Sequence, residues 1–226
     1  MAAVARLTYG WARGRYHASV YTMWNVLDML AKRHNYGCSD KSPWFSTKKS
    51  SKSACTGKSD RFNPFMFGYL RPVQMTEHAK HLRRIDAKVY CEVGMNAGHG
   101  TAAALLTKPD LISHSFDLLE WKYSPVVVDF LETTFPGRVH VHGGSSFTTV
   151  PAFFGTPGAP KCDAMLVDGL HTEEGTRRDL LNMRAAAACN HVVFIDDLES
   201  GRGSDLAMRK MVAAGATAGT LRAHRG

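Results

Sequence analysis

Three aspartates follow two apolar stretches in the second half of the sequence: Asp168 comes directly after 164–167, and Asp196 and Asp197 come directly after 191–195. If the two stretches are neighbouring strands, their ends lie about one strand spacing, ~5 Å, apart, and the carboxylates converge. Crowded carboxylates are costly unless a cation neutralises them, and oxygen ligands in this number suit Mg²⁺. We therefore predict that the three aspartates bind Mg²⁺ or another divalent cation.

A histidine, His171, lies three residues after Asp168. An imidazole with a pKa of about 6.5 can remove a proton from a substrate hydroxyl near neutral pH. We predict that His171 is a general base beside the acidic cluster; the alternative is a helix cap or a surface residue. Four other histidines have no comparable partner pattern, and we expect them to serve packing or the surface: His99, His114, His140 and His142.

A glycine-rich turn follows the apolar stretch 88–93 and reads EVGMNAGHG over residues 92–100. Glycines permit a tight turn and a close approach of a ligand to the backbone, and the following helix offers unpaired N–H groups to it. Gly98, Gly100 and Ala103 also satisfy the GxGxxG/A dinucleotide pattern, so the turn by itself leaves NAD as an alternative ligand.

A second acid, Asp117, follows the apolar stretch 111–116. A carboxylate at this place can accept hydrogen bonds from both hydroxyls of a ribose. NAD and S-adenosylmethionine both contain a ribose, so Asp117 does not separate them. Its alternative role is to cap the turn that follows.

Predicted strands alternate with predicted helices around these residues. We expect strands at 88–93, 111–116, 139–142, 164–167 and 191–195, and helices at 73–84, 101–106, 125–134 and 172–188. Such an alternation forms a parallel sheet whose ligands lie at the carboxyl ends of the strands. We predict an α/β, Rossmann-like, mainly parallel, doubly wound sheet of about six to seven strands, with helices on both faces.

The order of these motifs resembles that of the class I S-adenosylmethionine-dependent methyltransferases. Within that class the chain resembles the metal-dependent O-methyltransferases, including the macrocin-type enzymes (methyltransferase family 24), over about residues 66–200. The shared motifs are ExGxxxGxG, an acid ending the second strand, DGxH ending the fourth and a paired acid ending the fifth. The resemblance implies a cofactor site for S-adenosylmethionine formed by Glu92, Gly94, Asn96, Gly98, Gly100, Asp117, Ser145, Ser146 and Asp168.

The resemblance also implies a reaction. Asp168, Asp196 and Asp197 would hold Mg²⁺ against the oxygens of a small hydroxylated acceptor or sugar, and His171 would take the acceptor proton, with Asp168 beside it. The alkoxide or phenolate would then attack the sulfonium methyl group in line.

Two features depart from the family pattern. After the third predicted strand many relatives have Gly-Asp-Ser, with the acid near the adenine, but this chain has a neutral Ser145 at the acid's position. The sequence also ends soon after 206–214, which leaves little room for the final antiparallel hairpin typical of the class. We expect that the hairpin is abbreviated or that the N-terminal arm replaces its packing.

Three alternatives to an O-methyltransferase remain open. They are a non-catalytic methyltransferase-like subunit of a larger assembly, a hydroxylase-like relative on the same fold, and an NAD oxidoreductase. The NAD oxidoreductase leaves the three aspartates unexplained. The alternative roles of the aspartates are helix caps or ion-pair partners of arginines, namely Arg177, Arg178 and Arg202.

The basic charge of the chain is confined to its N-terminal part. Residues 1–90 hold 16 Lys and Arg against 5 Asp and Glu, whereas the remainder holds 12 against 15. We predict a basic arm at 1–65, with an amphipathic helix over about 16–33 that docks on the domain or covers the active site, and a Ser/Lys-rich loop at 39–60. Residues 66–226 form the cofactor-binding domain. The arm is expected to be solvated or to meet a protein partner or an acidic surface; we expect no specific nucleic acid.

The compartment is left open by the sequence. No apolar run approaches the roughly 18 residues of a membrane span, so none is expected. The Arg-containing, acid-poor N-terminus resembles a transit peptide in composition, so an organellar location stands beside a cytoplasmic one.

Five cysteines show no metal-binding spacing. We expect Cys91, Cys162 and Cys189 to be reduced core residues, and Cys38 and Cys55 to pair only in an oxidising compartment.

Overall fold

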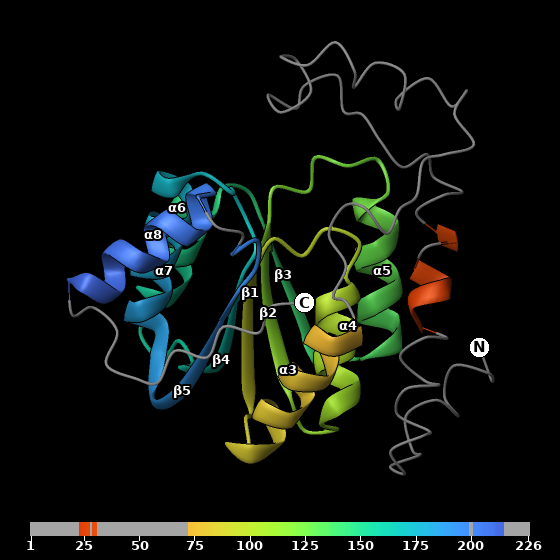
Figure 1. The fold of residues 1–226 in the computed structure, drawn as a ribbon. Coiled ribbons are helices and arrows are strands. Elements are labelled where there is room, and N and C mark those ends of the chain that lie inside the picture. Colours follow the sequence, from red (N-terminus) through yellow and green to blue (C-terminus); the bar gives the residue numbers. More distant parts are fainter. Residues whose placement is uncertain (1–22, 28, 31–71, 199–200, 215–226) are drawn as a thin grey trace.

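A parallel sheet of five strands, in the order β3-β2-β1-β4-β5, forms the centre of the protein (Figure 1). The computed structural model describes residues 23–27, 29–30, 72–198 and 201–214. The strands are β1 (Val89–Val93), β2 (Ile112–Asp117), β3 (Val139–Gly143), β4 (Cys162–Val167) and β5 (Ala187–Ile195). The predicted Rossmann-like sheet is confirmed, but the described residues contain five strands instead of six to seven, because the chain after β5 continues there as a helix.

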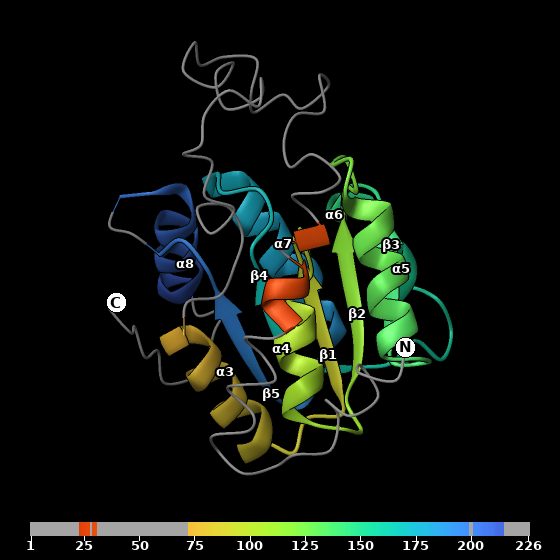
Figure 2. The same ribbon diagram turned by 90° about the vertical axis from the view of Figure 1, so that its right-hand side faces the viewer.

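Helices cover both faces of the sheet (Figures 1 and 2). One face carries α3 (Pro72–Arg84), α4 (His99–Thr107) and α5 (Ser124–Thr134), and the other carries α6 (Ser146–Phe154), α7 (Glu173–Ala186) and α8 (Gly203–Ala213). Parallel neighbours need such crossovers, which is why the central strand β1 is buried along nearly its whole length. All the loops that follow the carboxyl ends of the strands therefore gather at one edge.

Helix α6 was not predicted from the sequence. Its apolar residues Phe147, Val150, Phe153 and Phe154 recur at helical spacing, and Val150 is fully buried. The internal Pro151 and the β-branched threonines weaken that signal, because both residue types disfavour a helix.

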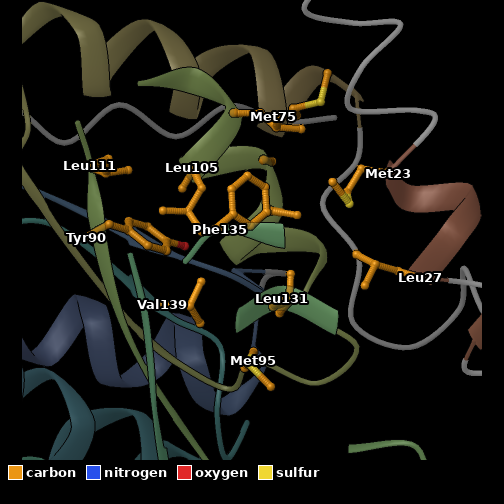
Figure 3. Close-up of a cluster of buried hydrophobic side chains, with 14 of the residues drawn as sticks. Met23, Leu27, Met75, Tyr90, Met95, Leu105, Leu111, Leu131, Phe135 and Val139 are labelled. Atoms are coloured by element: carbon orange, nitrogen blue, oxygen red, sulfur yellow. The ribbon is translucent and has the colours of Figure 1, made fainter. Parts of the chain in front are cut away.

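The N-terminal helix packs into the larger of the two cores (Figure 3). Residues 23–27 and 29–30 are helical, within the predicted span 16–33. Met23 and Leu27 are buried among side chains of α3, α4 and α5, and the Trp24 Nε1 donates a hydrogen bond to the carbonyl oxygen of His99 at 3.2 Å. These residues therefore dock on the domain, at the start of α4; the rest of the predicted arm and loop, with Cys38 and Cys55, lies outside the described residues.

The cysteine prediction was wrong in two respects. Cys91 and Cys162 are fully buried, as expected, but they form a disulfide between the neighbouring strands β1 and β4. A register irregularity between Cys162 and Ala164 accompanies this arrangement: strict alternation would place Cys162 and Met165 on opposite faces, yet both belong to the same core cluster. Cys189 is a free, exposed thiol in the exposed middle part of β5, which is an edge strand of the described sheet.

Candidate active site at the carboxyl edge of the sheet

The turn after β1 has the backbone conformation that its glycines allow. Gly94 and Gly98 have φ of 90° and 78°, in the left-handed region that favours glycine, and Asn96 lies there too, at 51°. Gly98 is the residue before α4. The predicted helix start at residue 101 was two residues late, so Gly100 lies inside the helix, where its missing side chain leaves room for the Glu92 carboxylate.

Asp117 holds this turn against the loop after β2. Its Oδ2 accepts a hydrogen bond from the backbone N–H of Asn96 at 2.8 Å, and its Oδ1 accepts one from the N–H of Leu119 at 2.7 Å. Burial raises the pKa of Asp117, and the backbone N–H donors oppose that rise. Each carboxylate oxygen accepts more than one hydrogen bond, so this arrangement leaves capacity for ribose hydroxyls.

Glu92 lies beneath the turn, in the core. Its side chain is 1% exposed and accepts hydrogen bonds from Tyr90, Thr101 and Ser115, the last at 3.0 Å. Burial raises its pKa to about 7, against the hydrogen bonds, which lower it. Glu92 thus supports the turn from below and ties β1 to β2 and α4; its partners Tyr90, Thr101 and Ser115 were not predicted.

The glycine turn touches the end of β4. A Cβ atom on Gly94 would lie 2.0 Å from the carbonyl oxygen of Asp168, so the two backbones are in direct contact. Val167 pairs with Ile195, and the N–H of Asp196 donates to the carbonyl oxygen of Val167 at 3.1 Å. The predicted adjacency of the β4 and β5 ends is confirmed.

His171 bridges two of the three predicted aspartates. Its Nδ1 lies 2.7 Å from Asp197 Oδ2 and its Nε2 lies 3.1 Å from Asp168 Oδ1. Burial raises the pKa of Asp168 to about 6. The pKa of His171 is raised as well, mainly by the hydrogen bond between His171 and Asp168. The imidazole is 43% exposed, so it remains open to a ligand.

The third aspartate has a different partner. Asp196 Oδ1 accepts a hydrogen bond from Gln74 Nε2 on α3 at 2.8 Å, a contact that the sequence did not predict. His171 therefore lies between Asp168 and Asp197, and Gln74 is bonded to Asp196. No group of three or more acidic, histidine or cysteine side chains in the described ranges is arranged to hold a metal ion. The residues as they stand therefore do not fit the predicted Mg²⁺ site.

The loop after β3 joins the same edge. The N–H of Gly144 donates to the carbonyl oxygen of Asp117 at 2.8 Å, which places Ser145 and Ser146 beside the β2 loop. Ser145 is exposed at the start of α6, and the Ser146 hydroxyl donates to Asp179 Oδ1 on α7 at 2.6 Å. Asp179 was not predicted from the sequence, because nothing in a helical acid's sequence shows that it is buried.

Comparison with known proteins supports one class for this fold and site. Residues 91–198 match the family model described as a methyltransferase domain. No curated protein matches the sequence. Among solved structures, TomG, an O-methyltransferase of tomaymycin synthesis from Streptomyces achromogenes, in complex with SAM, superposes with a TM-score of 0.53 at 14% identity, over 66% of this chain and 70% of that one.

Two further structures have the same fold. The O-methyltransferase from Bacillus cereus in complex with SAH has a TM-score of 0.54 at 13% identity, over 65% of this chain and 70% of that one. The apo TDP-rhamnose 3′-O-methyltransferase of calicheamicin biosynthesis has a TM-score of 0.54 at 21% identity, over 89% of this chain and 90% of that one.

The sheet order, the glycine turn and the acids at the strand ends define a class I methyltransferase fold. Residues 91–198 match a methyltransferase domain, which supports the predicted enzyme class, a methyltransferase, and the solved O-methyltransferase structures share its fold. Among the described helices, none is both long and apolar enough to cross a membrane.

Proposed function

We propose that the protein is an S-adenosylmethionine-dependent O-methyltransferase that methylates a hydroxyl of a small molecule or sugar. The observation that carries the proposal is the position of His171, held between Asp168 and Asp197 at the edge where the glycine turn meets β4. A base in that position lies next to the site expected for the methyl donor.

Two parts of this edge would bind the cofactor. Asp117 would accept the ribose hydroxyls, and the glycine turn would receive the methionine part, which brings the sulfonium toward Asp168 and His171. The fold relatives in complex with SAM or SAH support this cofactor.

His171 would act as the general base. Asp197, the nearer carboxylate, would accept the Nδ1 proton and orient the ring. Nε2, which lies 3.1 Å from Asp168 Oδ1, would then take the proton of an acceptor hydroxyl that enters beside Asp168. As the hydroxyl oxygen forms its bond to the methyl carbon, the carbon–sulfur bond breaks, S-adenosylhomocysteine leaves as a neutral thioether, and the proton passes to His171. Asp168 and Asp197 then stabilise the imidazolium.

Magnesium is the part of the prediction that the side-chain arrangement supports least. His171 lies between two of the predicted ligands and Gln74 bonds the third, so no step above depends on a metal. We test Mg²⁺ directly by measuring activity after EDTA treatment and after adding Mg²⁺ back.

The acceptor is proposed only by class. The sugar methyltransferase among the fold relatives makes TDP-rhamnose a reasonable probe, with catechol as a phenolic one. We also propose that residues 66–226 form the domain and that residues 1–65 form a basic arm. The arm would meet a protein partner or an acidic surface.

The experiment is formation of S-adenosylhomocysteine by the full chain with S-adenosylmethionine and a panel of hydroxylated acceptors that includes TDP-rhamnose and catechol. Acceptor-dependent turnover that His171→Gln reduces by about 10²- to 10⁴-fold supports the proposal. Tight cofactor binding with no turnover on any acceptor favours the non-catalytic subunit.

A further inference from the structure

Three histidines lie side by side on the face of the sheet that carries α6. The parallel register of β2 and β3 pairs His114 with His140 and Phe116 with His142. Side chains two residues apart on a strand point to the same face, so the three imidazoles share one face at the edge strand β3. The proposed reaction uses none of them.

Two ring nitrogens in this group lie at the spacing of ligands on one metal ion. His114 Nδ1 is 3.3 Å from His142 Nε2. Nitrogens bound to a tetrahedral zinc ion at about 2.0–2.1 Å lie about 3.3–3.4 Å from each other. Most N–H hydrogen bonds are shorter, at about 2.7–3.2 Å. The two nitrogens could therefore share an ion without a shift of either strand.

Both imidazoles favour the neutral form that a metal ion needs. Burial, and then the neighbouring His140 and His142, lower the pKa of His114 to about 4. The pKa of His142 is lowered as well, by burial first and by His140 second. Protons therefore compete little for the two nitrogens near neutral pH, where a metal ion binds neutral imidazole.

Aromatic side chains fix how the two rings lie. Phe116 stacks on the His142 ring with centroids 4.6 Å apart. Phe153, from α6, lies 4.8 Å from the His114 ring and 4.3 Å from the His142 ring. The exposed His140 stacks on His114 at 4.9 Å, at the open rim of the group. Ligands that packing already holds in place lose little freedom when they bind.

We infer that His114 and His142 bind a divalent transition-metal ion such as Zn²⁺, between Nδ1 of the first ring and Nε2 of the second. Each neutral ring then carries its proton on its other nitrogen. The described residues contain no group of three such side chains arranged for a metal, so we assign the remaining coordination positions to water. The ion would join β2 to β3, and this site does not depend on the proposed function.

The ligand type sets the selectivity. Imidazole nitrogens suit Zn²⁺, Ni²⁺ and Cu²⁺, whereas Mg²⁺ prefers oxygen ligands. We therefore expect that an excess of Mg²⁺ does not displace zinc from His114 and His142. This separates the site from the acidic cluster at the ends of β4 and β5, for which the sequence predicted Mg²⁺.

The test is calorimetric titration of Zn²⁺ into the full chain near neutral pH. The comparison is made in a His171→Gln background, so that zinc held by His171 and its two aspartates does not contribute. Adding His142→Gln should weaken zinc binding by at least about 100-fold, because loss of a group behind a metal ligand already costs 10- to 100-fold. Adding His191→Gln, at an exposed histidine of β5, should change nothing.

A second measurement covers variants that do not fold. Zinc should shift the imidazole NMR signals of His114 and His142 in the wild type and raise its midpoint of thermal unfolding. Zinc binding that leaves both imidazole signals unchanged would overturn the inference. So would equal zinc affinity in folded His142→Gln and its parent, or no zinc binding by the wild type at all.

Discussion

The backbones of Gly94 and Asp168 are in direct contact: a Cβ atom at position 94 would lie 2.0 Å from the Asp168 carbonyl oxygen. This contact joins the turn proposed for the cofactor to the strand end that carries the proposed chemistry. A change at Gly94 should therefore disturb both.

Gly94→Ala tests that junction. Gly94 and Gly137 both have positive φ, but a Cβ on Gly137 meets nothing within 4 Å. Gly137→Ala should lower the free energy of unfolding by about 1–2 kcal/mol, the cost of a left-handed backbone at a residue with a Cβ. Gly94→Ala should lower it by roughly 1–3 kcal/mol more, because its Cβ meets the Asp168 backbone, and should weaken binding of S-adenosylhomocysteine. Urea unfolding and calorimetry of both variants give the comparison; equal effects of the two would contradict the contact.

His171→Gln should reduce kcat by about 10²- to 10⁴-fold, the usual contribution of a general base, and leave the Kd for S-adenosylhomocysteine nearly unchanged. The acceptor is TDP-rhamnose or catechol, whichever the wild type methylates. His191→Gln is the control, because His191 is exposed on β5 and its hydrogen bond among the described residues is to the carbonyl oxygen of Ala188 on the same strand. Full activity in folded His171→Gln would remove His171 from the mechanism.

The Cys91–Cys162 disulfide closes a loop with a sequence separation of 71 residues. By loop-closure entropy, its reduction should lower the free energy of unfolding by about 4 kcal/mol. Urea unfolding with and without dithiothreitol measures this, and Cys189→Ser should show the same difference as wild type, since Cys189 is free. Alkylation of Cys91 in the unreduced, unfolded protein would show that the bond is not formed.

Glu92 should make stability fall as pH rises. Its pKa is raised from 4.5 to about 7, so the folded state favours the protonated acid. The stabilisation from that preference is complete below about pH 4.5 and is lost as pH rises through 7. Between pH 5 and 8 wild type should lose about 2–3 kcal/mol relative to Glu92→Gln, since one pKa unit corresponds to about 1.4 kcal/mol. Parallel curves of the two proteins, measured by urea unfolding, would contradict the raised pKa.

The sequence predicted a strand at each of the five places, because each contains apolar residues between two helical stretches, although β5 begins at Ala187 and not at residue 191. Asp117, Asp168 and Asp196 were placed correctly at strand ends for the same reason: the carboxyl ends of parallel strands must share one edge. The approach of β4 to β5 followed from the same rule.

Side-chain pairing could not be predicted in this way. Whether Asp196 meets a cation or the amide of Gln74 depends on how α3 lies against β5, which no local pattern encodes. The burial of Asp179 and the Cys91–Cys162 pair depend likewise on packing between elements far apart in sequence. The positions of the three aspartates at strand ends predicted a shared cation. The structure has the imidazole of His171 between Asp168 and Asp197, which the strand pattern does not predict.

Isothermal titration of S-adenosylhomocysteine into the full chain, with NAD as the rival ligand, tests the proposed cofactor site most directly. We expect a Kd on the order of 1–10 μM for S-adenosylhomocysteine and no detectable heat with NAD. Binding of NAD in its place, or of neither ligand by folded protein, would contradict the assignment of this edge to S-adenosylmethionine.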